Sequence, residues 1–198
     1  MYNRAMPVEY ETEAPFGVRT ALGPYREADY VALPDEPRCE LLYGRFVLMT
    51  SPVLRHQDVL IRLARFFLDF ADAHDGRAIM APMDVRLADH SVVQPDLLYV
   101  SNERKSVLHE RVRGAPDLVV EVLSPSTARR DLGEKLRLYG ESGIREYWVV
   151  DPAAKTFEFL VADNGGFRLA LPEAEVYSSP VIAGLELDLD AFWRSVPD

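Results

Sequence analysis

The chain has 198 residues, 48% of them hydrophobic, and a formal net charge of −10 at pH 7. This length and composition predict one globular domain with a buried core, while the negative charge argues against tight, non-specific nucleic-acid binding by a generally basic surface. The single cysteine, Cys39, excludes an intrachain disulfide and a cysteine-based zinc site. The sequence has no apolar run of membrane-spanning length and no apolar stretch of the signal-peptide kind at its start, so we expect a cytoplasmic protein without a membrane partner.

Residues 1–24 are rich in proline and acidic side chains and show no sustained periodicity, which predicts an N-terminal extension before a domain at 25–198. Helices alternate with strands in the rest of the chain, which predicts an α/β or α+β fold with helices packed against a mixed sheet. The hydrophobic patterns and turn residues predict a helix at 26–33, a hairpin of strands 39–42 and 46–49, a helix at 54–73, strands at 77–81, 84–87, 95–100 and 117–123, a helix within 126–142, strands at 146–150, 156–161, 167–171 and 185–189, and a last helical turn at 190–196.

The predicted helix at 54–73 has apolar residues at three- and four-residue spacing, which places them on one face. His56 precedes Leu60 by four residues and therefore shares that face at the start of the helix. A histidine in such a position is more often structural than functional. Glu40 lies in the predicted strand 39–42, which is too short for its alternation to orient the side chain.

Glu121 is a carboxylate inside the apolar run 117–123, which has the pattern of a central strand. Alternation puts Val119 and Glu121 on one face and Val120 and Val122 on the other, so Glu121 is expected to be covered. Burying an unpaired charge is costly, and the residue therefore needs a cation or hydrogen-bond donors. A nearby arginine or backbone amides would meet that need without any function.

Asp96 begins the second apolar strand, 95–100. An aspartate at a strand edge often only caps a turn. If this strand is a neighbour of 117–123, however, Asp96 and Glu121 could present oxygens to one hard cation such as Mg²⁺ or Mn²⁺.

Lys135 lies in the predicted helix within 126–142, where Asp131 and Glu134 have the spacing of a capping box and indicate a helix start at Asp131. A lysine on an apolar helix stripe either extends to the solvent at the edge or pairs with buried carboxylates. In the second case it can orient an attacking water or offset charge on a phosphate. The residues that share the stripe with Lys135 are Leu132, Leu136 and Tyr139.

Several segments resemble one known family, both in sequence and in order. They are Glu40-Leu-Leu-Tyr-Gly44, Ser51-Pro-Val-Leu-Arg-His56, Val93-Gln-Pro-Asp-Leu97, Gly114-Ala-Pro-Asp-Leu-Val-Val-Glu-Val-Leu-Ser-Pro-Ser126, Asp131-Leu-Gly-Glu-Lys135, Tyr139 and Glu146-Tyr-Trp-Val-Val-Asp-Pro152. Over about residues 25–192 the chain is similar to the Uma-two family of restriction-endonuclease-like proteins, within the PD-(D/E)XK nuclease superfamily. This resemblance implies a mixed central sheet flanked by helices, with acids on adjacent strands that bind a divalent metal.

The resemblance also implies roles for particular residues. Asp96 matches the motif aspartate and Glu121 the motif glutamate, and both would bind the metal, with the backbone carbonyl of Val122 completing the ligand set. The superfamily lysine expected two residues after the glutamate is Leu123 here. Lys135, on the predicted helix, is the candidate for a relocated lysine.

These observations predict a Mg²⁺- or Mn²⁺-dependent endonuclease that hydrolyses phosphodiester bonds, with DNA as the expected substrate. Asp96, Glu121 and Lys135 are the catalytic candidates, and Glu40 and His56 the supporting ones. By analogy with the superfamily we also expect a homodimer. Two alternatives stay open: a nuclease-fold module that binds nucleic acid or protein without cutting, and a structural carboxylate–lysine cluster in a protein of unrelated function.

Overall fold

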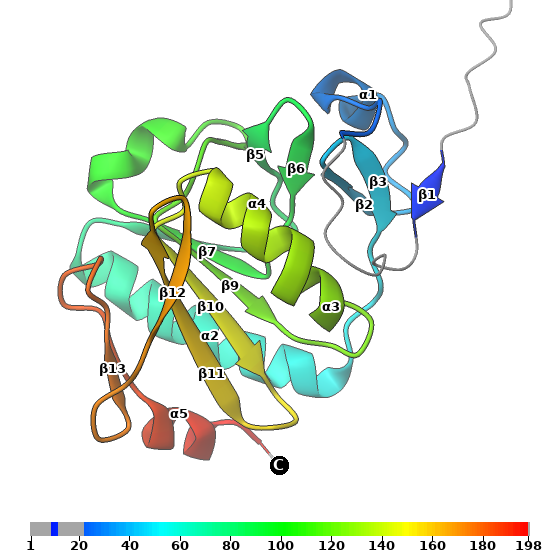
Figure 1. The fold of residues 1–198 in the computed structure, drawn as a ribbon. Helices are drawn as coiled ribbons and strands as arrows, with labels where there is room; N and C mark the ends of the chain where they lie inside the picture. Colours follow the sequence, from blue (N-terminus) through cyan, green and yellow to red (C-terminus); the bar gives the residue numbers. More distant parts are fainter. Residues whose placement is uncertain (1–8, 12–21, 198) are drawn as a thin grey trace, which may run out of the picture.

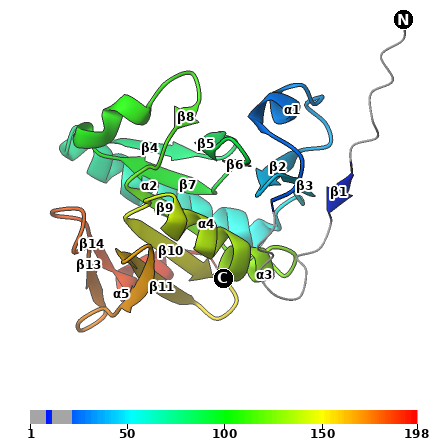
Figure 2. The same ribbon diagram turned by 45° about the horizontal axis from the view of Figure 1, so that its top comes forward.

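The computed structural model describes residues 9–11 and 22–197, whose strands form a central sheet, a second sheet and a small two-stranded sheet (Figures 1 and 2). Most of the predicted N-terminal extension, 1–24, lies outside the described residues. Within it, β1 (Tyr10–Glu11) pairs in parallel with β3 (Arg45–Leu48). Among the helices of the described ranges, none is long and apolar enough to cross a membrane.

The central sheet is mixed. Its neighbours β9 and β10 are parallel, and the other strand pairs are antiparallel. All residues of β9 are buried, as expected of an apolar strand with cover on both faces. The strand order is β12 (Gly166–Ala170), β11 (Thr156–Asp163), β10 (Glu146–Asp151), β9 (Leu118–Val122), β7 (Leu97–Val100) and β4 (Arg77–Met80).

The second sheet packs beside the central one, where its residues Leu42 and Val85 join Leu98 and Val119 of the central sheet in one buried cluster. The cluster fixes the second sheet against the face of β9 that also carries Glu121, because Val119 and Glu121 point the same way. The strand order is β1, β3, β2 (Cys39–Leu42), β6 (Ser91–Val93), β5 (Val85–Ala88) and β8 (Val112–Arg113).

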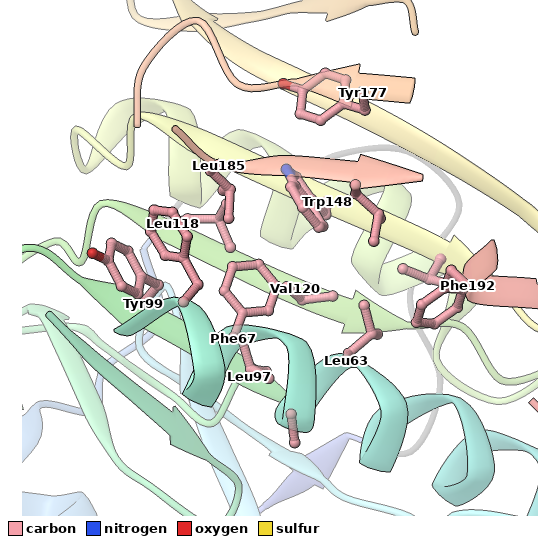
Figure 3. Close-up of a cluster of buried hydrophobic side chains, with 14 of the residues drawn as sticks. Leu63, Phe67, Leu97, Tyr99, Leu118, Val120, Trp148, Tyr177, Leu185 and Phe192 are labelled. Atoms are coloured by element: carbon pink, nitrogen blue, oxygen red, sulfur yellow. The ribbon is translucent and has the colours of Figure 1, made fainter. Parts of the chain in front are cut away.

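The long helix α2 (Leu54–Ala73) covers the opposite face of the central sheet and has the predicted bounds. Its residues Leu63 and Phe67 pack against Val120 and Trp148 in the main hydrophobic core (Figure 3). The rings of Phe67 and Trp148 lie 5.1 Å apart, and both side chains are fully buried. The three- and four-residue spacing of apolar residues in this segment is thus explained by a single buried face.

A second helical segment lies on the other face of the central sheet, in front of it in Figure 1. It consists of α3 (Ala128–Arg130), a π-helical turn η2 (Asp131–Lys135) and α4 (Leu136–Glu141). The predicted helix start at Asp131 is wrong, since Asp131 and Glu134 lie inside the segment and are buried. Leu132 is 43% exposed instead of lying on the buried stripe, because the wider π turn directs the two acids and Lys135 inward.

The C-terminal part closes the α2 side of the core with β13 (Val176–Ser178), β14 (Glu186–Asp188) and α5 (Leu189–Ser195). The buried carboxylate of Glu146 joins this part to the central sheet by accepting hydrogen bonds from Trp148 Nε1 (2.6 Å), Tyr177 OH (2.8 Å) and Ser179 Oγ (2.5 Å). These contacts satisfy a carboxylate that would be costly to bury alone.

The predicted fold class is confirmed: one α+β domain with mixed sheets flanked by helices. The second sheet was not expected as a separate layer, because its strands β1, β6 and β8 are two or three residues long and too short to show a period of their own. The remaining short elements are α1 (Glu27–Val31), within the predicted helix 26–33, and the 3₁₀ helix η1 (Asn102–Val107), which was not predicted.

Candidate active site

Asp96 and Glu121 come together because β7 and β9 are antiparallel neighbours in the register Leu97↔Val120. Extending that register by one residue places Asp96 opposite Glu121. Asp96 is anchored here through its Oδ2 atom, which accepts a hydrogen bond from the backbone N–H of Val122 at 2.8 Å. The strand adjacency on which the predicted carboxylate pair depended is therefore confirmed.

The Glu121 carboxylate is 3% exposed and receives two donors at the same oxygen. Lys135 Nζ donates to Glu121 Oε1 at 2.8 Å, and Tyr139 OH donates to the same atom at 2.5 Å. None of the described residues donates to Glu121 Oε2. In Asp96 likewise, no described residue donates to Oδ1, since the contacts of its carboxylate are made by Oδ2. Each acid of the pair thus keeps one oxygen free for another ligand.

Lys135 is the shared cation of three buried acids. Besides Glu121, its Nζ lies 3.0 Å from Glu40 Oε1 and 3.7 Å from Asp131 Oδ1. Glu40, expected only near the site, is in direct contact with Lys135, and its Oε1 also accepts the backbone N–H of Gln94 at 2.8 Å. Asp131 Oδ1 is buried without a hydrogen-bond partner in the described structure.

The charges of this cluster do not balance, because three carboxylates surround one ammonium group. Burial raises the pKa of Glu121 well above its ordinary value, since the neighbouring acids offset much of the effect of Lys135. Burial likewise raises the pKa of Asp131, to about 6. For Lys135, burial lowers the pKa, but Glu121, Glu40 and Asp131 outweigh it and raise the pKa well above the ordinary value. The lysine is therefore charged, and the raised pKa values of Glu121 and Asp131 reflect their burial together with the repulsion among the acids around it.

His56 lies beside the pair, on the buried face of α2 as predicted. Its Nε2 is 3.1 Å from Asp96 Oδ2, and its Nδ1 is buried without a partner among the described residues. Burial lowers the pKa of His56, but the hydrogen bond and charge of Asp96 outweigh it and raise the pKa overall. A histidine that holds one oxygen of Asp96 also fixes where the other oxygen points.

These side chains line a cavity of about 170 Å³ that opens between β2, α2 and the α3–η2 segment. Its wall includes Glu40, His56, Asp96, Glu121, Val122, Arg130, Asp131 and Lys135. Within residues 9–11 and 22–197, no three His, Cys, Asp or Glu side chains already form a metal cage. The free oxygens of Asp96 and Glu121, in a cluster with more carboxyl groups than cations, nevertheless fit a hard divalent cation, which prefers carboxylate and carbonyl oxygens and displaces protons from such groups.

Two residues of the candidate site, Tyr139 and Asp131, were not predicted to contact the other site residues. The sequence places Tyr139 on the apolar stripe of the predicted helix, and in the structure its hydroxyl donates to Glu121. Asp131 was interpreted as a helix cap, yet it faces Lys135 inside the cavity. The spacing Asp131, Lys135, Tyr139, each four residues from the next, places such residues on one helix face and could have signalled this grouping.

Comparison with known proteins agrees with this fold. A curated relative from Synechocystis sp., "Uncharacterized protein slr1290", is 24% identical over 160 residues, which cover 79% of this chain and 84% of the relative. The crystal structure of "a putative nuclease belonging to DUF820" from Anabaena variabilis superposes with a TM-score of 0.72 at 18% identity, covering 88% of this chain and all of that one. At this identity the likeness shows the fold alone.

The family model of Uma2, described as "Putative restriction endonuclease", matches residues 27–190. The match includes both candidate metal-binding acids, Lys135, Glu40 and His56. Because it extends over most of the sequence, this chain belongs to the Uma2 family.

Proposed function

We propose that this protein is a metal-dependent nuclease that hydrolyses phosphodiester bonds, with DNA as its substrate. The observation that carries the proposal is the pair Asp96 and Glu121, each with an unused oxygen, beside the buried cation Lys135 in an open cavity. Two carboxylates near a lysine are suited to hydrolysis of an anionic ester, and family membership favours a nucleic-acid substrate.

Asp96 and Glu121 would hold Mg²⁺ or Mn²⁺, and the backbone carbonyl of Val122 would be a further ligand. A divalent cation supplies Lewis-acid stabilisation of the negative charge that develops on the phosphate. Before it binds, His56 and the Val122 N–H keep Asp96 in place, while Lys135 and Tyr139 keep Glu121 in place. This preorganisation lowers the cost of assembling the site.

Lys135 would be the catalytic cation. Its Nζ has two short contacts, to Glu121 and Glu40, and a third acid, Asp131, lies too far for a hydrogen bond. The ammonium group can therefore turn one N–H toward an attacking water or a phosphate oxygen. Leu123, at the position of the superfamily lysine, cannot supply that proton donor or charge.

Cleavage of plasmid DNA in the presence of Mn²⁺ tests the proposal. Asp96→Asn and Glu121→Gln preserve shape but remove a charge, and each is expected to abolish cleavage. Glu158→Gln is the matched control, because Glu158 is exposed on β11, away from the cavity. Full activity in either Asp96→Asn or Glu121→Gln would refute the assigned roles.

A second candidate is a nuclease-fold module that binds nucleic acid or protein without cutting. The close ion pairs of Lys135 with Glu121 and Glu40 favour it, because they engage the cation that catalysis would need. DNA binding with no metal-dependent cleavage would support this module over the enzyme.

The homodimer and the cytoplasmic location remain predictions. Sedimentation velocity would test whether the protein is a homodimer.

A further inference from the structure

Arg130 is a buried arginine whose guanidinium group has no partner in the part of the chain that the structure describes. The residue is 4% exposed and lines the cavity. No described residue makes a hydrogen bond or an ion pair with its guanidinium group, whereas the buried Arg45 pairs with Glu134 at 2.5 Å. Arginine is almost never buried so completely unless it is paired. No acid within residues 9–11 and 22–197 therefore compensates the charge of this group, which leaves it available to an anionic ligand.

The backbone explains why this cation reaches the cavity. A regular α-helix turns by about 100° per residue, so residues five apart point about 140° away from each other. Arg130 immediately precedes the π turn η2, whose wider winding brings residues five apart closer to alignment. As a result, both Arg130 and Lys135 line the same cavity. Such π turns occur frequently at functional sites.

The cavity wall consequently offers two kinds of binding group. Asp96 and Glu121 offer free carboxylate oxygens, which suit a cation. Arg130 offers a planar set of N–H donors, which matches the oxygens of a phosphate. The hydroxyls of Ser124 and Thr127, 3.1 Å apart, also line the wall and add neutral donors of the kind that often contact phosphates.

We propose that the guanidinium group of Arg130 binds a backbone phosphate of the substrate next to the phosphodiester that is cut. Arg130 is then a substrate-binding residue that sets which phosphodiester faces Asp96 and Glu121. The choice of a nucleic-acid phosphate as the ligand rests on the proposed nuclease function. The observation that Arg130 is buried without a partner among the described residues is independent of that function.

This observation is tested first, by thermal unfolding. Because Arg130 has no partner to lose among the described residues, Arg130→Gln is expected to have a melting temperature no lower than that of the wild type. A sharp fall in the melting temperature would mean that Arg130 is the counter-ion of a structural pair, and the inference would be overturned.

Ligand binding is tested by fluorescence anisotropy with a short labelled DNA duplex, titrated with NaCl in EDTA and, separately, in Ca²⁺. Losing one phosphate contact should reduce the slope of log affinity against log salt by about 0.9. We expect this reduction and weaker binding in Arg130→Gln, and a retained slope in Arg130→Lys. Arg168→Gln is the control, since Arg168 is exposed on the edge strand β12 and removes the same charge away from the cavity.

An unchanged slope and affinity in Arg130→Gln would overturn the inference, and so would a wild type that binds the duplex in neither buffer. These results are separable from the nuclease proposal. Metal-dependent cleavage that is unchanged in Arg130→Gln would support the nuclease proposal and refute the role of Arg130. Binding through Arg130 with no cleavage would leave Arg130 as a phosphate ligand and refute the nuclease.

Discussion

Lys135→Met provides a quantitative test of the buried cluster in metal-free protein. The ammonium group is 2.8 Å from Glu121 and 3.0 Å from Glu40, and Lys135 is 4% exposed. Methionine fills similar space but leaves the acids without their cation. Removing one partner of a buried ion pair costs about 3–5 kcal/mol. For a chain of this size, that loss lowers the melting temperature by roughly 6–20 °C.

The cost should depend on pH, because the acids can take up protons. The pKa of Glu121 is already raised, that of Asp131 is about 6, and both rise further once Lys135 is gone. A carboxyl whose pKa is higher in the folded state stabilises the fold at low pH, and this contribution is lost as the pH rises through the folded pKa. The deficit of Lys135→Met should therefore be smaller at about pH 5 than at about pH 8.

Urea denaturation in EDTA, followed by circular dichroism at both pH values, measures this deficit. Lys105→Met is the control, since Lys105 is exposed and its replacement should change stability by no more than about 0.5 kcal/mol. Adding Glu121→Gln to Lys135→Met should restore part of the loss. Equal stability of Lys135→Met and the wild type, or a deficit independent of pH, would refute the description of Lys135 as the shared cation of buried acids.

Three further outcomes are expected. Tyr139→Phe removes a buried hydrogen bond to Glu121 and should lower the free energy of unfolding, measured in urea, by about 1.5–3 kcal/mol. A decrease below about 0.5 kcal/mol would contradict this contact. In an NMR titration, the pKa of His56 should lie above its ordinary value and should fall in Asp96→Asn, which removes the negative charge that raises it. A His56 pKa that is the same in Asp96→Asn and the wild type would contradict the contact between the two residues. Phe67→Ala should cost about 3–5 kcal/mol through the cavity left beside the central sheet, whereas a near-neutral change would place Phe67 outside the core.

Much of the fold could be predicted from local pattern. The helix α2 was found at its true ends because its apolar spacing is regular over 20 residues. The strand containing Glu121 was recognisable because it is apolar on both faces, and its alternation correctly separated Val119 from Val120. Short strands such as β6 carry too few residues for any pattern, and their pairing is decided by long-range contacts.

The sequence indicates which residues belong to the candidate site better than it indicates how their side chains contact one another. Asp96, Glu121 and Lys135 follow from the strand and helix patterns together with the family resemblance, but the direct pairing of Glu40 with Lys135 depends on how the second sheet packs. The inward position of Asp131 involves a π-helical turn, which the capping-box interpretation of this residue does not anticipate.

Calorimetric titration of Mn²⁺ into the wild type and Glu121→Gln tests the central claim most directly. The account predicts binding to the wild type and to the exposed control Glu158→Gln, and loss of binding in Glu121→Gln, because the charged oxygen of Glu121 would be a ligand. Absence of Mn²⁺ binding in the wild type, or unchanged binding in Glu121→Gln, would contradict a metal site at Asp96 and Glu121.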